Sequence, residues 1–306
     1  MKVILLGPQR RPTVDAVVRS LGADGPVAAI TAGWQEQELD YGELSARLGG
    51  RDVNLALYRR WLDVQERDPG YAAGERRLAD LLAGLHEEYL VRLDYALQAV
   101  YALARRGLDT DAAIAAVRDL DAAHLRRGNE ARGEFFERMP PHERPVIAGH
   151  RAEVSAALRE TVALVVAGGH VNLLTDLLHL FNVAAAARDA DAAGPGLPVI
   201  AWSAGAMALT DRIVLFHDRA AEGPGHPEVY GSGLSLLRGA VLLPHARARL
   251  LLDDTARMSV FARRFAPASC VLLEQGTRLD TDESGHWPPG ARLLGDDGRV
   301  LTREVA

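Results

Sequence analysis

Ser203 lies in the stretch of this sequence best suited to nucleophilic chemistry. It follows the apolar run 198–202, and small residues beginning with Ala204 come directly after it. A buried strand that leads straight into a helix places such a serine on a tight turn, with its hydroxyl above the sheet edge and the Ala204 N–H facing developing negative charge. This is the geometry of the G-x-S-x-G nucleophile elbow, although Ala201 replaces the first glycine. The alternative is a serine that only caps a helix.

A serine nucleophile needs a base, an orienting acid and donors for an oxyanion. Three predicted strands end in groups of these kinds, which are Gly168-Gly169-His170, Pro244-His245 and Glu274-Gln275. Paired glycines allow backbone N–H groups to approach a substrate closely, or they serve a loop that needs positive φ. His245 is placed to act as the base of Ser203, and Glu274 is placed to orient the imidazole.

The surrounding pattern alternates strands and helices, which favours a parallel sheet. Residues 3–6 and 27–31 read as strands with a helix beginning at 12–13 between them, a β-α-β unit with a right-handed crossover. The loop 32–36 then follows the carboxyl end of a strand, where ligands of open α/β sheets bind. Further elements are helices at 152–160, 173–181 and 258–265, strands at 162–166, 212–216, 240–243 and 271–273, a loop at 222–233, and a hairpin from Asp280 onward.

Residues 42–138 form a helical insertion in this pattern. Residues 54–67 look helical, and leucines and tyrosines from Leu78 to Leu97 repeat at spacings of three and four. We predict two or three long helices without a strand, broken at Gly107. The apolar stripe would pack into the core or against a second copy, so the insertion is compatible with a homodimer. The whole chain, 1–306, is then one α/β domain that carries this insertion.

Composition narrows the class of protein. The 306 residues are 48% hydrophobic and 25% charged, typical of a globular protein, and the net charge of −6 gives no reason to expect nucleic acid or an anionic membrane as a partner. The single cysteine, Cys270, excludes an intramolecular disulfide and a multi-cysteine metal site. The apolar run 3–6 is too short for a signal peptide, and no other run is long enough to span a bilayer. We therefore expect a cytoplasmic protein.

Several motifs together resemble one known family. Trp202-Ser203-Ala204-Gly205-Ala206, preceded by Ala167-Gly168-Gly169 and followed by 233–237 and Leu243-Pro244-His245, is similar to the peptidase E family of aspartyl dipeptidase-like serine hydrolases. Cyanophycinase is a more distant relative of that family. The resemblance covers roughly residues 162–279 and the first β-α-β unit. It implies a class I glutamine amidotransferase-like, flavodoxin-like fold with a doubly wound, mostly parallel sheet.

The resemblance also implies roles for individual residues. Ser203 would be the nucleophile and His245 the general base, Gly169 and Ala204 would supply the oxyanion N–H groups, and Asp218 matches an aspartate linked to activity. It implies no metal and no organic cofactor. Family substrates are small peptides with an N-terminal aspartate, for which Arg10, Arg11 and Arg247 are the candidate arginines.

Two positions depart from the family pattern. His170 replaces an asparagine, and Gln275 stands where the family has its acid. Glu274, one residue earlier, would face the opposite side of the strand if the extended backbone continued. An amide in place of the carboxylate can cost ~10⁴ in rate. Either Glu274 or Asp218 replaces the acid, or the site is weak, or it no longer hydrolyses.

These patterns predict a serine-dependent hydrolase of a peptide or amide bond, with a small peptide or amide as substrate. The alternative is a catalytically impaired family member that binds a small molecule or a protein partner, which Gln275 and the insertion favour. A third reading, an amidotransferase-type glutaminase, is disfavoured because Ser203 stands in the position of the elbow cysteine.

Overall fold

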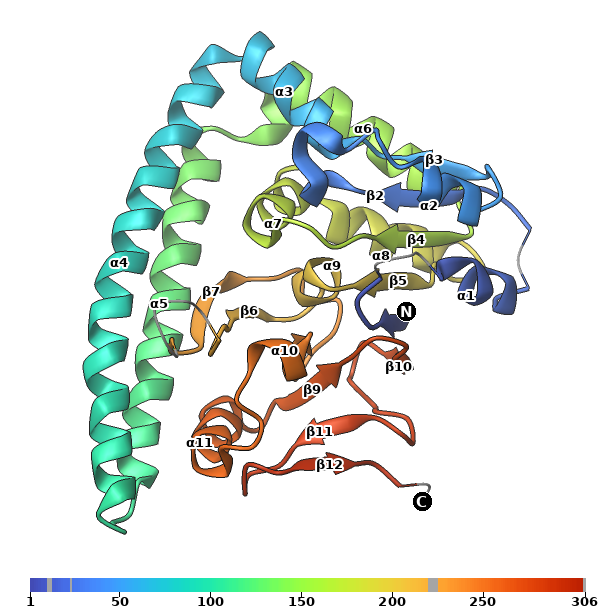
Figure 1. Ribbon diagram of the computed structural model, residues 1–306. Helices are drawn as coiled ribbons and strands as arrows, with labels where there is room; N and C mark the ends of the chain where they lie inside the picture. Colours follow the sequence, from blue (N-terminus) through green and yellow to red (C-terminus); the bar gives the residue numbers. More distant parts are fainter. Residues whose placement is uncertain (10–12, 23, 220–224, 305–306) are drawn as a thin grey trace.

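The computed structural model describes residues 1–9, 13–22, 24–219 and 225–304. It is a mixed α/β structure with a mostly parallel central sheet and many helices (Figure 1). The central sheet has the strand order β10-β1-β5-β4-β2-β3, and only β10 runs antiparallel to its neighbour. Its strands are β1 (Lys2–Leu6), β2 (Val27–Ile30), β3 (Asp52–Asn54), β4 (Ala163–Val166), β5 (Val199–Trp202) and β10 (Arg278–Asp282).

Helices cover both faces of this sheet. Ile4 and Leu6 of β1 pack on one face with α1 (Val14–Ser20) and α2 (Gly42–Arg47). Val3 and Leu5 pack on the other face with α3 (Leu57–Arg67), α6 (Pro145–Arg159), α7 (Val171–Leu180) and α8 (Val183–Ala193). Burial on both faces explains why β1, β4 and β5 are continuous apolar runs in the sequence.

A second sheet lies beside the first and has the order β12-β11-β9-β8. Its strands are β8 (Ala240–Pro244), β9 (Ser269–Leu273), β11 (Arg292–Leu294) and β12 (Val300–Thr302), and β6 (Arg212–Leu215) pairs separately with β7 (Glu228–Ser232). The short helices α9 (Ala204–Ala208) and α10 (Ala246–Arg249) follow β5 and β8, and α11 (Thr255–Phe265) precedes β9. Because β8 and β9 are parallel, their carboxyl ends lie at one edge.

Two long helices, α4 (Pro69–Arg105) and α5 (Asp111–Arg138), form an antiparallel hairpin. Figure 1 shows the hairpin on the side toward which β4 and β5 run, where α7 and α9 begin. Tyr89, Leu93 and Val117 of the hairpin share a core with β7, β8 and α11. None of the helices in the described ranges combines the length and apolar character that a bilayer span requires.

Residues 42–138 are mainly helical, as their spacing predicts, but the prediction that they contain no strand was wrong. Residues 52–54 form β3, which extends the sheet beside β2. Three half-exposed residues at an edge carry no apolar run that could signal a strand. The helix expected from Asn54 begins at Leu57.

Two further expectations also needed correction. The predicted loop 222–233 contains strand β7, and its residues 222–224 lie outside the described ranges. The hairpin expected from Asp280 is formed by β11 and β12, whereas 278–282 pair with β1. The predicted parallel arrangement of β1 and β2 is confirmed, with β5 and β4 between them in the sheet. The predicted helix start at residue 12 lies outside the described residues.

Candidate active site

Ser203 occupies a strained turn between β5 and α9. Its backbone angles, φ 50° and ψ −125°, are unfavourable for a residue with a Cβ and cost about 1–3 kcal/mol. Its hydroxyl makes no capping hydrogen bond to α9, and the residue is half-buried. Helix capping therefore does not explain why a serine stands at this position.

Two glycines allow the loop after β4 to press against this turn. A Cβ on Gly205 would lie 2.3 Å from the Val166 carbonyl oxygen, so α9 can begin here only with glycine at that position. A Cβ on Gly168 would lie 2.8 Å from the Ser203 Cβ. The glycines of the sequence motif thus bring backbone within contact distance of the serine.

Gly169 and Ala204 carry the N–H groups expected to bind an oxyanion. Within the described residues, neither N–H donates a hydrogen bond to another protein group. Gly169 has a positive φ of 129°, and a Cβ there would lie 2.3 Å from the Gly33 carbonyl oxygen. Both N–H groups thus lie in the residues next to the Gly168–Ser203 contact, and no hydrogen bond among the described residues uses either as a donor.

His170 is exposed and caps helix α7. Its backbone N–H donates to the Gly33 oxygen at 2.8 Å, and its Nδ1 accepts from the Leu173 N–H at 3.3 Å. The sequence singled out the loop 32–36 but did not predict the contact of Gly33 with Gly169, for which the glycine at position 33 was the available signal.

The backbone of Gln35 in the same loop was also not predicted. Its φ of 58° and ψ of −123° match those of Ser203.

His245 and Glu274 follow adjacent parallel strands. The His245 N–H donates to the Leu273 oxygen at 3.1 Å, and the His245 backbone is left-handed, with φ 58°. The Glu274 Oε1 accepts from the Arg247 N–H at 2.8 Å, in the first turn of the helix that His245 caps. The carboxylate of Glu274 is thus bound to the backbone two residues after His245.

The extended backbone does not continue past Glu274. The Glu274 carbonyl accepts from the Thr277 N–H at 2.9 Å, and Gly276 has φ 82°, so the chain turns. Strand alternation therefore does not direct Glu274 away from the site. Gln275 is exposed on this turn.

The end of β1 connects the Glu274 turn with the neighbourhood of Ser203. Leu6 of β1 lies opposite Trp202 of β5, so the next residues, Gly7 and Ser203, leave neighbouring strands at the same level. The Gly7 N–H donates to the Thr277 oxygen at 2.8 Å. Neighbouring strands are about 4.8 Å apart, so the loops after β1, β5 and β4 lie at one edge of the central sheet. The Gly7–Thr277 hydrogen bond brings the loop after β9 to the same edge.

Asp218 forms a buried structural ion pair. Only 2% of its surface is exposed, and its carboxylate accepts from Arg257 Nη2 at 2.6 Å and from the Leu251 N–H at 3.1 Å. The two carboxylate oxygens of Asp218 thus bind α11 and the segment that precedes it. Arg10 and Arg11 lie outside the described residues, and Arg247 lines a hollow of about 600 Å³ with Arg219, Arg292 and Arg299.

The described ranges contain no group of three or more His, Cys, Asp or Glu residues arranged to hold a metal ion. Burial raises the pKa of the Cys270 thiol to about 12, and the residue lies in the core. The Cys270 thiol is therefore protonated at neutral pH and is neither a nucleophile nor a metal ligand there.

Comparisons with known proteins give little further information. No protein family model and no curated protein matches the sequence. A solved structure of a peptidase from an acI-B1 Actinobacterium is 12% identical, with a TM-score of 0.45, over 99% of this chain and 94% of that chain. A similarity of this size does not identify a fold family or an activity.

Proposed function

We propose that this protein is a serine-dependent hydrolase of a peptide or amide bond, with Ser203 as its nucleophile. The observation that carries the proposal is the Ser203 turn, which has φ 50° at a non-glycine residue and a hydroxyl that does not cap the following helix. Strained backbone persists where the surrounding structure enforces it, and it clusters at functional sites. The strand–serine–helix arrangement is that of a nucleophile elbow.

In this mechanism, Ser203 Oγ attacks the carbonyl carbon while His245 accepts the hydroxyl proton. The N–H groups of Gly169 and Ala204 stabilise the oxyanion, and Glu274, whose carboxylate accepts a hydrogen bond from the first turn of α10, orients the imidazole. His245 then donates the proton to the leaving amine. Water, deprotonated by His245, releases the acyl group and regenerates Ser203.

Labelling with a fluorophosphonate probe tests this proposal, because only an activated serine reacts at a useful rate. We expect the purified protein to be labelled and the Ser203→Ala variant not to be labelled. A matched control is Ser235→Ala, which replaces another serine with a positive φ, of 50°, outside the site. Labelling that survives Ser203→Ala would contradict the assignment of the nucleophile.

A binding module with an impaired catalytic centre is the second candidate function. The exposed position of Gln275, where the family places an acid, favours it. Absence of labelling in protein that is folded by circular dichroism, together with binding of a substrate-like peptide at this edge, would support that function instead.

A further inference from the structure

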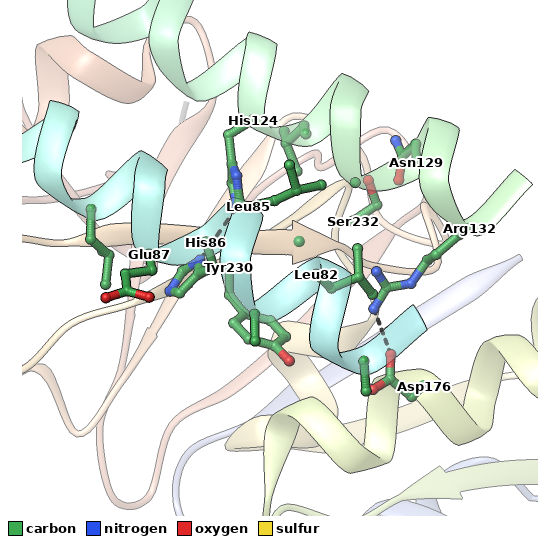
Figure 2. Close-up of a pocket in the computed structure, with 16 residues that line it drawn as sticks. Leu82, Leu85, His86, Glu87, His124, Asn129, Arg132, Asp176, Tyr230 and Ser232 are labelled. Carbon is green, nitrogen blue, oxygen red and sulfur yellow. Dashed lines mark hydrogen bonds and ion pairs between the residues drawn. The ribbon is translucent and has the colours of Figure 1, made fainter. Parts of the chain in front are cut away.

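A separate cavity lies between the α4–α5 hairpin and the α/β body. Its volume is about 360 Å³, within the range of small-molecule sites. Figure 2 shows side chains from four elements around it, including Leu82 and His86 of α4, Arg132 of α5, Asp176 of α7 and Tyr230 of β7. Elements far apart in the sequence therefore form its wall.

A buried polar network holds the hairpin in place beside this cavity. Arg264 of α11 donates to both carboxylate oxygens of Asp121, at 2.8 and 2.6 Å, and to the Tyr89 hydroxyl at 2.9 Å. The Tyr89 hydroxyl in turn accepts from the Val229 N–H of β7 at 3.0 Å. The Tyr89 ring stacks on the His124 ring, with 4.2 Å between the ring centroids. The cavity thus has a fixed wall, as a preformed binding site requires.

The polar end of the cavity carries one cation and one anion. Arg132 Nη2 donates to Asp176 Oδ1 at 2.6 Å. Among the described residues this bond uses one of the five guanidinium N–H groups and one carboxylate oxygen, so both side chains keep capacity for a ligand. Arg132 is 24% exposed and Asp176 47% exposed, so both groups are accessible.

The rest of the wall is mainly apolar and ends in two histidines. The apolar part consists of Leu82, Leu85, Leu90, Leu125 and the small residues around them. At the end away from Arg132, His86 Nδ1 lies 3.4 Å from His124 Nε2. Burial lowers the pKa of His124, so its ring is neutral at pH 7. Glu87 is exposed at the rim.

We propose that this cavity binds a free α-amino acid with a large apolar side chain. The α-carboxylate pairs with Arg132 and the α-ammonium with Asp176, while the side chain lies between Leu82, Leu85 and Leu125. A cation and an anion side by side match a zwitterion, whereas a singly charged ligand satisfies only one of them. The proposal does not depend on hydrolysis at Ser203, because a free amino acid contains no bond for that site to cleave.

Isothermal titration with L-phenylalanine tests the charge argument. The matched analogues are 3-phenylpropanoate, which lacks the ammonium group, and phenethylamine, which lacks the carboxylate. We expect saturable binding of L-phenylalanine and at least about tenfold weaker binding of each analogue, the ratio that one ion pair lost in a partly dry site produces. Equal binding of either analogue, or no saturable binding of L-phenylalanine at about 10 mM, would overturn the proposal.

Substitutions of the two charged residues test whether L-phenylalanine binds in this cavity. Arg132→Gln and Asp176→Asn should each weaken L-phenylalanine binding about tenfold or more. Arg127→Gln is the control, because it removes an exposed ion pair to Glu88 from the same helix outside the cavity wall.

Filling the cavity provides a test that does not depend on the ion pair. Gly128 lines the wall, and a Cβ there would meet nothing closer than Leu82 Cδ2 at 3.9 Å, so a leucine fits the helix and extends into the space. Gly128→Leu should abolish binding without lowering the thermal midpoint. Retained binding in Gly128→Leu would show that the amino acid binds elsewhere and would overturn the assignment.

Discussion

The strain at Ser203 is the feature of single residues that links the backbone to the proposed chemistry. Ser203 and Gln35 have nearly the same angles, and both follow carboxyl ends of strands in the central sheet. A glycine would adopt these angles without a Cβ clash. A serine at such a position costs stability, and the proposed nucleophile gives a reason for it.

This strain predicts an unusual order of stabilities. Ser203→Gly should unfold with a free energy about 1 kcal/mol higher than Ser203→Ala, because glycine relieves the positive φ and alanine keeps it. Urea denaturation of the two variants measures the difference, and neither should react with the fluorophosphonate probe. An alanine variant as stable as the glycine variant would show that the turn is not strained.

Glu274, rather than Gln275, should be the acid that supports His245. The carboxylate of Glu274 binds the first turn of α10, and Gln275 is exposed on the turn that follows. Glu274→Gln should slow fluorophosphonate labelling by about 10²–10⁴-fold, as loss of an orienting carboxylate does in serine hydrolases. Gln275→Glu is the matched change and should leave the labelling rate near that of the wild type. Faster labelling in Gln275→Glu would reverse the assignment.

At the scale of elements, the hairpin depends on one buried ion pair. Arg264 and Asp121 are each 2% exposed as side chains and connect α11 to α5. Asp121→Asn should lower the free energy of unfolding by about 3 kcal/mol, because it leaves the guanidinium buried without its counter-ion. The control is Glu134→Gln, which removes an exposed pair with Arg138 on the same helix and should change stability by less than about 1 kcal/mol. Similar losses in both variants would contradict the importance of burial.

Elements with a strong periodic pattern were predictable, and those defined by partners were not. The apolar runs of β1, β4, β5 and β8 and the helical stripe of α4 appear in the sequence and in the structure. Strand β3 exists because β2 offers it an edge, which no three-residue pattern reveals. Likewise, the backbone after Glu274 depends on a turn closed by Thr277, so strand periodicity alone cannot predict the direction of its side chain.

At the scale of the whole molecule, the interface between the hairpin and the α/β body contains three histidines whose pKa values are lowered chiefly by burial. They are His124 on α5, His179 on α7 and His226, which lies 3.4 Å from Asp94 of α4. Protonation of these rings would place positive charge in the interface. The docking of the hairpin should therefore be sensitive to pH.

The direction of this dependence follows from proton binding. The folded protein keeps these rings neutral below the usual histidine pKa of 6.5, whereas the unfolded chain binds protons there. Their stabilising contribution is thus complete above pH 6.5 and is lost as the pH falls toward the lowered pKa values. Half-buried Glu75 has a raised pKa, chiefly through desolvation, and acts in the opposite sense, since its protonated form is favoured in the folded state as the pH falls toward 4.5.

We therefore expect the free energy of unfolding, measured with urea, to fall between pH 7.5 and pH 6.0. His124→Gln should reduce that fall, because it removes one of the three groups that take up a proton on unfolding. His286→Gln is the control, since the His286 side chain is 81% exposed and outside the interface. A fall that is unchanged in His124→Gln but reduced in His286→Gln would place the pH-sensitive group on the surface and exclude the interface as its origin.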